Sequence, residues 1–381
     1  MLEEFLKNKP LYYTEIDYAR MPKVYEKIKS HFKISKIVHI VGTNAKGTTG
    51  RFLAAALVSK GFKVGHYTSP HIVEFNERIW LNGDNVSNKE LESAHKQLQL
   101  ILSEKESAQL SYFEYTTFLA MLIFNECEYI ILEAGLGGEY DATAVFPKLL
   151  TLVTPIDLDH EAFLGNSIHS IATTKLNAMQ NSVILANQKF PEVRLIAKDI
   201  ALKKDAKIYA IKDFLNTQDE KKINEISEQL SLVNYLKENL KLSISALKFL
   251  KINYSSKNFE NARLFGRLSK IADNVTVDVG HNPLAAHSIV EALEGKKYIL
   301  VYNSYKDKDY KEILRILKPL IWHVEIIDIV GERVESKEFI QRALNELEIK
   351  YSEFKAVKPD KEYLVFGSFS VVETFLREYN E

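Results

Sequence analysis

A glycine-bearing loop between a predicted strand and a predicted helix carries the clearest chemistry in this chain. The loop is Gly42-Thr43-Asn44-Ala45-Lys46-Gly47-Thr48-Thr49, and apolar runs at 36–41 and 52–57 flank it. Such a turn points backbone N–H groups and the positive end of a helix dipole at one spot, and Lys46 adds a positive charge. The pattern predicts a nucleoside triphosphate site. Its nucleotide-binding residues are expected to be Asn44, Ala45, Lys46, Gly47 and Thr48.

The loop departs from the general phosphate-loop pattern at two positions. Ala45 stands where a glycine normally precedes the lysine, and Gly47 stands where a serine or threonine normally follows it. Gly47 has no hydroxyl for Mg²⁺, so that ligand is displaced by one position or comes from elsewhere in the fold. Taken alone, the loop could also be an ordinary connection from a strand to a helix.

Two further predicted strands end in polar side chains. The strand at 62–67 leads into Thr68-Ser69-Pro70-His71, and the strand at 129–133 ends with Glu133. Functional groups of open parallel sheets gather at the carboxyl ends of the strands. A carboxylate beside a phosphate loop is a natural Mg²⁺ ligand. The alternatives are that Ser69 is a turn hydroxyl and that Glu133 is an ion-paired strand end.

Five motifs occur in order along the chain: GTNAKGTT, YTSPHIVEFNERI, ILEAGLGGEYDAT, DLDHEAFLGNSI and DVGHNPLAA. Together they resemble the folylpolyglutamate synthase and dihydrofolate synthase family, relatives of the Mur ligases. The resemblance implies a ligase that uses ATP and Mg²⁺ to add L-glutamate to dihydropteroate, to folates, or to both. Such enzymes phosphorylate the acceptor carboxylate, and the amino group of glutamate then attacks the acyl phosphate.

The resemblance also implies roles for individual residues. The magnesium ligands of the family correspond to Ser69, Glu133 and His160. The catalytic positions correspond to Lys46, His160 and Lys175, the last of which is carbamylated in the family. The helix around Lys175 reads ATTKLNA, whereas family members usually read GxEKAGI, so a neighbouring glutamate is missing. From the residues alone, His160 could be a hydrogen-bonded loop residue and Lys175 an unmodified lysine on a solvated helix.

Two segments match the dihydropteroate contacts of the family. They are Ser111-Tyr112-Phe113, before a predicted helix, and Tyr140-Asp141-Ala142. An aromatic ring can stack on a pterin, and a carboxylate can accept hydrogen bonds from its N–H groups. Phe113 could equally belong to the hydrophobic core.

The C-terminal part of the chain resembles the nucleotide-clamping segments of the family. Arg267 is expected to cover phosphates, and Asp278 is expected to hold the ribose hydroxyls. His281 and Asn282 could face a cleft or simply cap the helix that follows. A family asparagine opens a helix of pattern NAxxALAA. Its nearest counterpart here is taken as Leu242, which cannot hydrogen-bond adenine.

Predicted strands and helices alternate as in a doubly wound α/β sheet. The strands are expected at 36–42, 62–67, 129–133, 150–154 and 182–186. The helices are expected at 47–60, 88–104, 113–125, 167–180 and 191–203. The alternation restarts after Gly266 and includes a strand at 363–366, and 381 residues exceed one ordinary core. We therefore expect a P-loop-type, Mur-ligase-like ATP-binding domain at 1–266 and a smaller Rossmann-like glutamate-ligase domain at 267–381.

Composition narrows the functional class. Hydrophobic residues make up 46% and charged residues 27% of the chain, as in a soluble globular protein. No apolar run approaches the ~20 residues that a membrane span needs. The start Met1-Leu2-Glu3-Glu4 lacks an export signal, so a cytoplasmic location is expected. A net charge of −1 gives no electrostatic case for nucleic acid. Cys127 is the only cysteine, which excludes an internal disulfide. A monomer is expected.

Two alternative functions stay open at this stage. A Mur-type amino-acid ligase would need a separate N-terminal UDP-binding domain, which we do not expect here. A degenerate nucleotide-binding relative without catalysis is favoured by Ala45, Thr174 and Leu242. The joint retention of five functional residues favours an enzyme instead. They are Lys46, Ser69, Glu133, His160 and Lys175.

Overall fold

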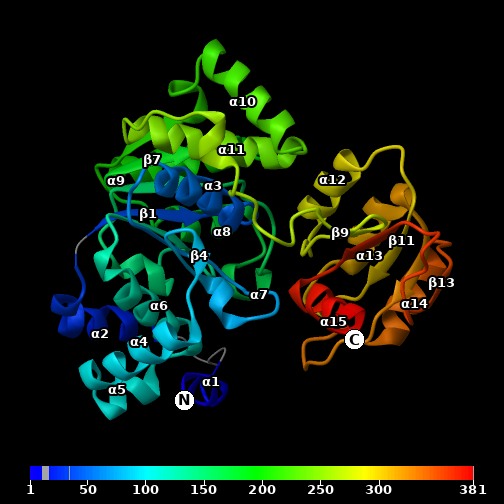
Figure 1. Cartoon of the computed structure of the whole chain (residues 1–381), viewed down its shortest axis with the longest axis horizontal. Coiled ribbons are helices and arrows are strands. Elements are labelled where there is room, and N and C mark those ends of the chain that lie inside the picture. Colours follow the sequence, from blue (N-terminus) through cyan, green and yellow to red (C-terminus); the bar gives the residue numbers. More distant parts are fainter. Residues whose placement is uncertain (11–16, 34, 381) are drawn as a thin grey trace. The chain divides into compact units, whose positions relative to one another are not determined.

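The computed structural model describes residues 1–10, 17–33 and 35–380 (Figure 1). The chain folds into two compact units. The first unit comprises Met1–Leu232 with Leu236–Arg263, and the second comprises Val233–Tyr235 with Leu264–Glu381. The division falls three residues before the expected boundary at Gly266. The functional assignment of the two units as an ATP-binding and a glutamate-ligase domain stays a prediction.

The first unit is built on an eight-stranded sheet of order β4-β3-β2-β5-β1-β6-β7-β8. Neighbouring strands from β2 to β8 in this order are parallel, and β3 and β4 extend the sheet in antiparallel fashion. The strands are β1 (Lys36–Val41), β2 (Val64–Tyr67), β3 (Ile79–Leu81), β4 (Asp84–Asn85), β5 (Tyr129–Glu133), β6 (Leu150–Val153), β7 (Ser182–Leu185) and β8 (Lys207–Ala210). The order changes direction beside β1, and such a switch point opens a crevice at the carboxyl ends of the strands.

Helices cover both faces of this sheet, as expected of a doubly wound fold. They are α1 (Leu2–Lys7), α2 (Arg20–Ile28), α3 (Lys46–Ser59), α4 (Asn88–Ile101), α5 (Glu104–Gln109), α6 (Tyr112–Ile123), α7 (Glu161–Leu164), α8 (Ile168–Leu176), α9 (Pro191–Lys203), α10 (Thr217–Gln229) and α11 (Asn234–Phe249). Helices α3, α10 and α11 lie on one side of β1, and α2, α4 and α6 lie on the other (Figure 1). Val38 and Ile40 of β1 pack with the first group, whereas Ile37 packs with the second. This alternation follows from the two-residue period of a strand.

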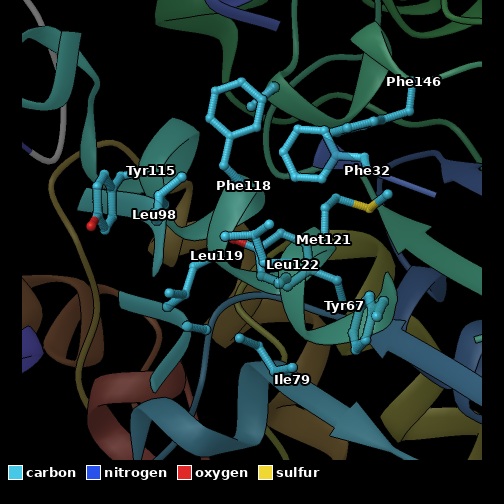
Figure 2. Close-up of a cluster of buried hydrophobic side chains, with 14 of the residues drawn as sticks. Phe32, Tyr67, Ile79, Leu98, Tyr115, Phe118, Leu119, Met121, Leu122 and Phe146 are labelled. Atoms are coloured by element: carbon cyan, nitrogen blue, oxygen red, sulfur yellow. The ribbon is translucent and has the colours of Figure 1, made fainter. Parts of the chain in front are cut away.

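The helix α6 is buried nearly all round and holds the core on its side of the sheet (Figure 2). The ring of Phe118 stacks on Phe32 at 5.7 Å between centroids and meets Phe146 edge-on at 6.3 Å. Such aromatic contacts add to the free energy gained by burial. The packing fixes the start of α6, and with it the predicted acceptor segment 111–113.

The second unit contains a six-stranded sheet of order β13-β12-β11-β14-β10-β9, in which only β9 is antiparallel to its neighbour. Its elements are β9 (Ser269–Ala272), β10 (Val275–Val277), α12 (Pro283–Ala292), β11 (Tyr298–Tyr302), α13 (Tyr310–Leu317), β12 (Ile321–Ile326), α14 (Lys337–Glu346), β13 (Tyr351–Glu353), β14 (Tyr363–Phe366) and α15 (Phe369–Asn380). Leu300 and Leu364 pack with α12, α13 and α14. The expected smaller Rossmann-like α/β fold is confirmed.

Some element predictions need correction. The expected helix at 88–104 ends at Ile101, because Ser103 accepts a hydrogen bond from the N–H of Glu106 and opens a new helix, α5. A capping box formed by Ser87 and Glu90 opens α4. The strands β3, β4, β8, β9 and β13 escaped prediction, because each is short and lies at or next to a sheet edge.

Cys127 is buried, and burial raises the pKa of its thiol to about 12. A structural role for this cysteine follows. In the part of the chain that the structure describes, no helix is both long enough and apolar enough to cross a membrane.

Substitution of Gly65 tests the packing of the central strand β2. A Cβ at this position would lie 2.3 Å from Cδ1 of Phe124. We expect Gly65→Ala to lower the free energy of unfolding by about 1–3 kcal/mol, measured by urea denaturation. In a protein that already carries Phe124→Leu, the Gly65→Ala substitution should lower the free energy of unfolding by less than it does in the wild type. An unchanged urea midpoint for Gly65→Ala would contradict this packing.

Candidate functional site

The phosphate loop leaves the carboxyl end of β1, and the segment that follows the neighbouring strand β6 ties it down. The N–H of Thr43 donates to the carbonyl of Pro155 at 3.0 Å, and its hydroxyl donates to the carbonyl of Asp157 at 3.0 Å. Ala45 is left-handed, with φ 74°, immediately before α3. A left-handed residue other than glycine costs roughly 1–2 kcal/mol. The backbone therefore explains why a glycine normally stands here.

Lys46, Ser69 and Glu133 are brought together as the sequence predicted. The Nζ of Lys46 lies 3.2 Å from each of the carbonyl oxygens of Gly42 and Thr43, and 3.9 Å from Oε1 of Glu133. The other carboxylate oxygen of Glu133 accepts the N–H of Ser69 at 3.3 Å and the hydroxyl of Thr68. Sequence reasoning missed this role of Thr68, although it directly precedes Ser69. Glu133 thus keeps one oxygen toward Lys46.

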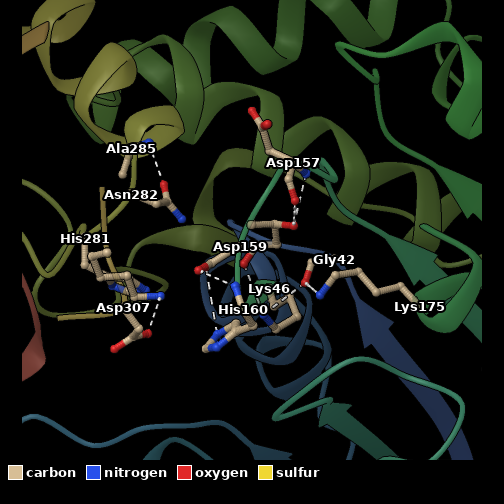
Figure 3. A network of polar contacts seen from close by, with 12 residues as sticks. Gly42, Lys46, Asp157, Asp159, His160, Lys175, His281, Asn282, Ala285 and Asp307 are labelled. Carbon is tan, nitrogen blue, oxygen red and sulfur yellow. Dashed lines mark hydrogen bonds and ion pairs between the residues drawn. The ribbon is translucent and has the colours of Figure 1, made fainter. Parts of the chain in front are cut away.

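Lys175 lies in the same cluster and is not on a solvated face. Its side chain is buried, with the residue 3% exposed, and its Nζ donates to the carbonyl of Gly42 at 3.0 Å. Burial, followed by the positive charge of Lys46, lowers the pKa of Lys175 to about 7. Figure 3 shows Lys46 and Lys175 converging on Gly42. A large fraction of this amine is therefore uncharged near neutral pH. Carbamylation requires that form and stays a prediction.

His160 joins the cluster through its neighbour Asp159. Its backbone is left-handed, with φ 54°, and its N–H donates to Oδ1 of Asp159 at 2.9 Å. The imidazole Nε2 lies 3.9 Å from Oδ2 of the same carboxylate (Figure 3). Asp159 is buried, and its negative charge acts on Lys175. Sequence reasoning did not single out Asp159, although it is the second acidic residue of the DLDH motif.

Several buried polar atoms of the first unit have no hydrogen-bond partner among the described residues, and two of them bear on the nucleotide site. They are Oγ1 of Thr48 and Nδ2 of Asn239. Thr48 stands one position after the usual hydroxyl of a phosphate loop, which matches the displacement expected from Gly47. Buried polar atoms are normally hydrogen-bonded, so each is a candidate ligand contact.

Asn239 is a second candidate, besides Leu242, for the counterpart of the family asparagine. Leu242 is a core residue of α11. The run NLKLSISA, which begins at Asn239, places an asparagine at the first position of the pattern NAxxALAA and an alanine at its last. One turn further along, the hydroxyl of Ser243 donates to the carbonyl of Thr49 at 2.8 Å, which ties α11 to the helix of the phosphate loop.

The segment Ser111-Tyr112-Phe113 is held in a defined conformation at the start of α6. The hydroxyl of Ser111 accepts the N–H of Glu114 at 3.2 Å and caps the helix. Phe113 is half-buried and stacks on Tyr67, with 5.6 Å between ring centroids. Its ring packs so closely on Gly135 that a Cβ there would lie 2.8 Å from it. The ring therefore serves the core on at least one side.

Tyr140, Asp141 and Ala142 have three different environments. Tyr140 is 55% exposed and lies 4.2 Å from Tyr18 between ring centroids. Both tyrosines line a pocket of about 190 Å³, together with Tyr25 and Asp141. Ala142 is a core residue.

Asp141 braces the loop that carries it. Its carboxylate accepts the N–H groups of Gly135, Leu136 and Thr143 at 2.9, 3.0 and 2.9 Å. Burial raises the pKa of Asp141, and these hydrogen bonds oppose that shift. The assignment of Asp141 to a pterin stays a prediction.

The predicted residues of the second unit are tied to their own neighbours. The guanidinium of Arg267 lies 5.4 Å from the ring centroid of Phe369. Asp278 is buried and accepts the hydroxyl of Tyr235 at 3.2 Å, besides the N–H groups of Leu268 and Gly280 at 2.9 and 2.8 Å. Burial raises the pKa of its carboxyl group, and the charge of Arg267 opposes that shift. The structural alternative holds for Asn282, which caps α12.

The side chains present fit Mg²⁺ when phosphate oxygens complete its coordination. In the described ranges, no group of three or more His, Cys, Asp and Glu side chains could hold a metal by itself. Mg²⁺ beside nucleotides is commonly bound through one or two carboxylates plus phosphates and water. Glu133 offers such a carboxylate, and Ser69 and Thr48 offer hydroxyl groups.

Comparisons with known proteins find relatives that this chain matches over most of their length. It matches no family model. It is 30% identical over 372 residues to the dihydrofolate synthase/folylpolyglutamate synthase of Buchnera aphidicola subsp. Acyrthosiphon pisum, covering 90% of this chain and 89% of that protein. The crystal structure of Helicobacter pylori folylpolyglutamate synthetase is 39% identical, with a TM-score of 0.81 over 100% of this chain and 98% of that one. The structure of E. coli FolC in complex with DHPP and ADP shares the fold at 23% identity, with a TM-score of 0.82 over 98% and 95%.

The buried amine of Lys175 predicts a pH-dependent stability. Its pKa is about 7 in the folded protein and the usual 10.5 in the unfolded chain, so unfolding takes up a proton between these two pH values. The free energy of unfolding therefore rises as the pH increases from about 7. Lys175→Met removes this titration. Between pH 7 and 8.5, the advantage of the variant over the wild type should shrink by about 1–2 kcal/mol.

The measurement is urea denaturation at each pH in buffers freed of carbon dioxide. The exposed Lys198 on α9 provides the control, since Lys198→Met should show no such trend. A constant difference between Lys175→Met and the wild type across this range would show that burial does not disfavour the charged form of Lys175.

Proposed function

This chain belongs to the dihydrofolate synthase/folylpolyglutamate synthase family, and we propose that it uses ATP to join L-glutamate to dihydropteroate and to folates. The observation that carries the proposal is the cluster at the carboxyl ends of β1, β2 and β5. There, Lys46, Lys175 and Glu133 surround the phosphate loop. Two amines, one carboxylate and a loop of backbone N–H groups suit phosphoryl transfer, which needs positioning and charge neutralisation more than covalent help.

The reaction proceeds in two steps. A carboxylate oxygen of the acceptor attacks the γ-phosphorus of ATP, and ADP leaves. The amino group of glutamate then attacks the carbonyl carbon of the acyl phosphate, inorganic phosphate leaves, and a proton is lost from nitrogen. Lys46 places its positive charge at the transferring group. Magnesium held by Glu133 and Ser69 would supply further positive charge to neutralise the phosphate oxygens.

Four residues are assigned to support that charge balance. Glu133, with Ser69, would hold the metal, and the hydroxyl of Thr68 fixes the carboxylate in place. His160, oriented by Asp159, would complete the metal site. Lys175 in its uncharged form can add carbon dioxide and become an anion. The pKa of about 7 supports this assignment despite the missing glutamate.

For the nucleotide, we assign Asn44, Ala45, Gly47 and Thr48 to the phosphates and Asn239 to the adenine. The unpartnered, buried amide of Asn239 supports its assignment. In the second unit, Arg267 is assigned to phosphates and Asp278 to the ribose. The ribose hydroxyl would then take the place that the hydroxyl of Tyr235 holds on Asp278.

For the acceptor, we assign Phe113 and Tyr140 as ring platforms for the pterin. The pocket of about 190 Å³ beside Tyr140 supports this, because its walls are aromatic and acidic, as a ring rich in N–H donors requires. Asp141 forms one wall of this pocket, and Ser111 and Ala142 hold the two segments in shape.

The remaining expectations complete the proposal. The partners are small molecules: ATP, L-glutamate and dihydropteroate or a folate. The net charge of −1 supports the absence of nucleic acid among them. We also propose that the chain acts as a monomer, in the cytoplasm and not on a membrane.

Phosphate release tests the function directly. With ATP, Mg²⁺ and L-glutamate, we expect release that depends on dihydropteroate and, separately, on tetrahydrofolate. Lys46→Ala should reduce both rates by about 100-fold or more at an unchanged melting temperature, because it removes charge from the transferring group. Acceptor-dependent release that survives in Lys46→Ala would contradict the role of the loop. No release with either acceptor would refute the function.

The role of Glu133 is tested by a magnesium titration of activity. Glu133→Gln keeps the size of the side chain and removes its charge, so the Mg²⁺ concentration for half activity should rise about tenfold or more, equivalent to about 1.4 kcal/mol. Glu128→Gln is the matched control, since the side chain of Glu128 accepts a backbone N–H, from Lys63 at 3.2 Å, away from the phosphate loop. If Glu133→Gln titrates like the wild type, Glu133 is structural.

A further inference from the structure

Arg78 is a nearly buried cation beside the acceptor segment. It ends the short 3₁₀ helix Phe75–Arg78, and only 9% of the residue is exposed. Its Nε donates to Nδ1 of His71 at 2.7 Å, and its guanidinium lies 5.2 Å from the ring centroid of Tyr112. Among the residues that the structure describes, no carboxylate lies within ion-pair distance of Arg78.

His71 cannot neutralise this charge. Because its Nδ1 accepts a hydrogen bond from Arg78, the ring carries its proton on Nε2 and is neutral. The adjacent carboxylate of Glu77 is committed elsewhere, since it accepts the backbone N–H groups of Ile72, Val73 and Glu74, each at 2.8 Å.

A buried charge without a counter-ion is unfavourable, and buried arginines are normally paired. An anionic ligand would supply the missing partner. The planar guanidinium, already oriented by His71 and supported by the ring of Tyr112, is suited to bidentate binding of a carboxylate.

The position of Arg78 restricts which anion this can be. Its carbonyl oxygen accepts the N–H of Thr68 at 2.9 Å, and the hydroxyl of Thr68 donates to Glu133. On its other side lies Tyr112 of the acceptor segment. The charge thus stands between the proposed phosphoryl-transfer cluster and the acceptor.

We propose that Arg78 binds the carboxylate of the acceptor that is not phosphorylated, namely the α-carboxylate of the terminal glutamate of a folate. This rests on the proposed function. The reacting carboxylate must offer a lone pair to phosphorus, and a bidentate guanidinium would occupy those lone pairs. The second carboxylate does not react, so its lone pairs are available to the guanidinium. Dihydropteroate lacks it, so Arg78 is a specificity-determining residue that admits folates to a site shared with dihydropteroate.

Binding measurements test this without turnover. We compare dihydropteroate with dihydrofolate, which differs by one glutamate, and with dihydrofolate α-amide, in which the α-carboxylate is neutral. Arg78→Gln should weaken the binding of dihydrofolate by about 10- to 100-fold, which is the loss expected for a charge-assisted hydrogen bond. The affinity of Arg78→Gln for dihydropteroate should stay within about threefold of the wild-type affinity. The α-amide should bind the wild type and Arg78→Gln equally.

Arg78→Lys keeps the charge but loses the planar guanidinium with its paired N–H donors. Its affinity for dihydrofolate should therefore fall between those of Arg78→Gln and the wild type. The control is Arg51, which is also nearly buried and lies over an aromatic ring, 4.6 Å from the centroid of Trp80. Arg51→Gln should change the melting temperature but not the ratio of dihydrofolate to dihydropteroate affinity.

An equal loss for both acceptors in Arg78→Gln, or no loss for dihydrofolate, overturns the proposal. The proposal is also overturned if Arg78→Gln prefers dihydrofolate to its α-amide by the same factor as the wild type does. If the wild type binds these ligands but releases no phosphate from ATP, the proposed function fails, and the affinity ratios still decide the role of Arg78.

Discussion

The carbonyl oxygen of Gly42 is the point on which the candidate site depends. Lys46 and Lys175 both donate to it, from helices that begin more than a hundred residues apart in the chain. Two positively charged amines beside one oxygen repel each other, and burial, followed by this repulsion, lowers the pKa of Lys175. The low pKa of Lys175 and the carboxylate of Glu133 near Lys46 relieve the repulsion. The sheet order, with β5 beside β1, is what brings Glu133 within reach.

Two cations of the site, Lys46 and Arg78, have no carboxylate at hydrogen-bonding distance among the described residues. Lys46 faces Glu133 at 3.9 Å, which is longer than a hydrogen bond, and Arg78 has only a neutral imidazole as its hydrogen-bond partner among the described residues. Asp141, although it belongs to the loop after β5, is occupied by three backbone N–H groups. These two cations suit ligands that bring several negative charges, as ATP and a folate do.

Two left-handed residues and two polar groups that lack a partner in the described part of the chain belong to the candidate site. Ala45 and His160 are both left-handed, and both lie in loops at the carboxyl ends of central strands. Thr48 and Asn239 bury polar atoms without partners among the described residues. Deviations of this kind are tolerated where a ligand completes the structure.

Much of the fold was predictable because the relevant signals are local. The strands β5 and β14 and the helix α9 were predicted to the residue, since buried parallel strands read as short apolar runs and Pro191 marks the start of its helix. The strands β4 and β8 were not, because edge strands of two to four residues carry no clear period. Asn239, three residues before Leu242 in the same helix, was not considered as a nucleotide contact, because its burial without a partner among the described residues shows only in the structure.

The sequence by itself determined the phosphate loop, the polar residues that follow the strands, and hence the edge of the sheet where chemistry is placed. These depend on residue types within one segment. Only the tertiary structure decided that Lys175 is buried against Gly42, that Asp141 is committed to its own loop, and that Arg78 meets a neutral imidazole and no carboxylate among the described residues. Burial and charge compensation arise from segments distant in the chain, and no local pattern of residues specifies them.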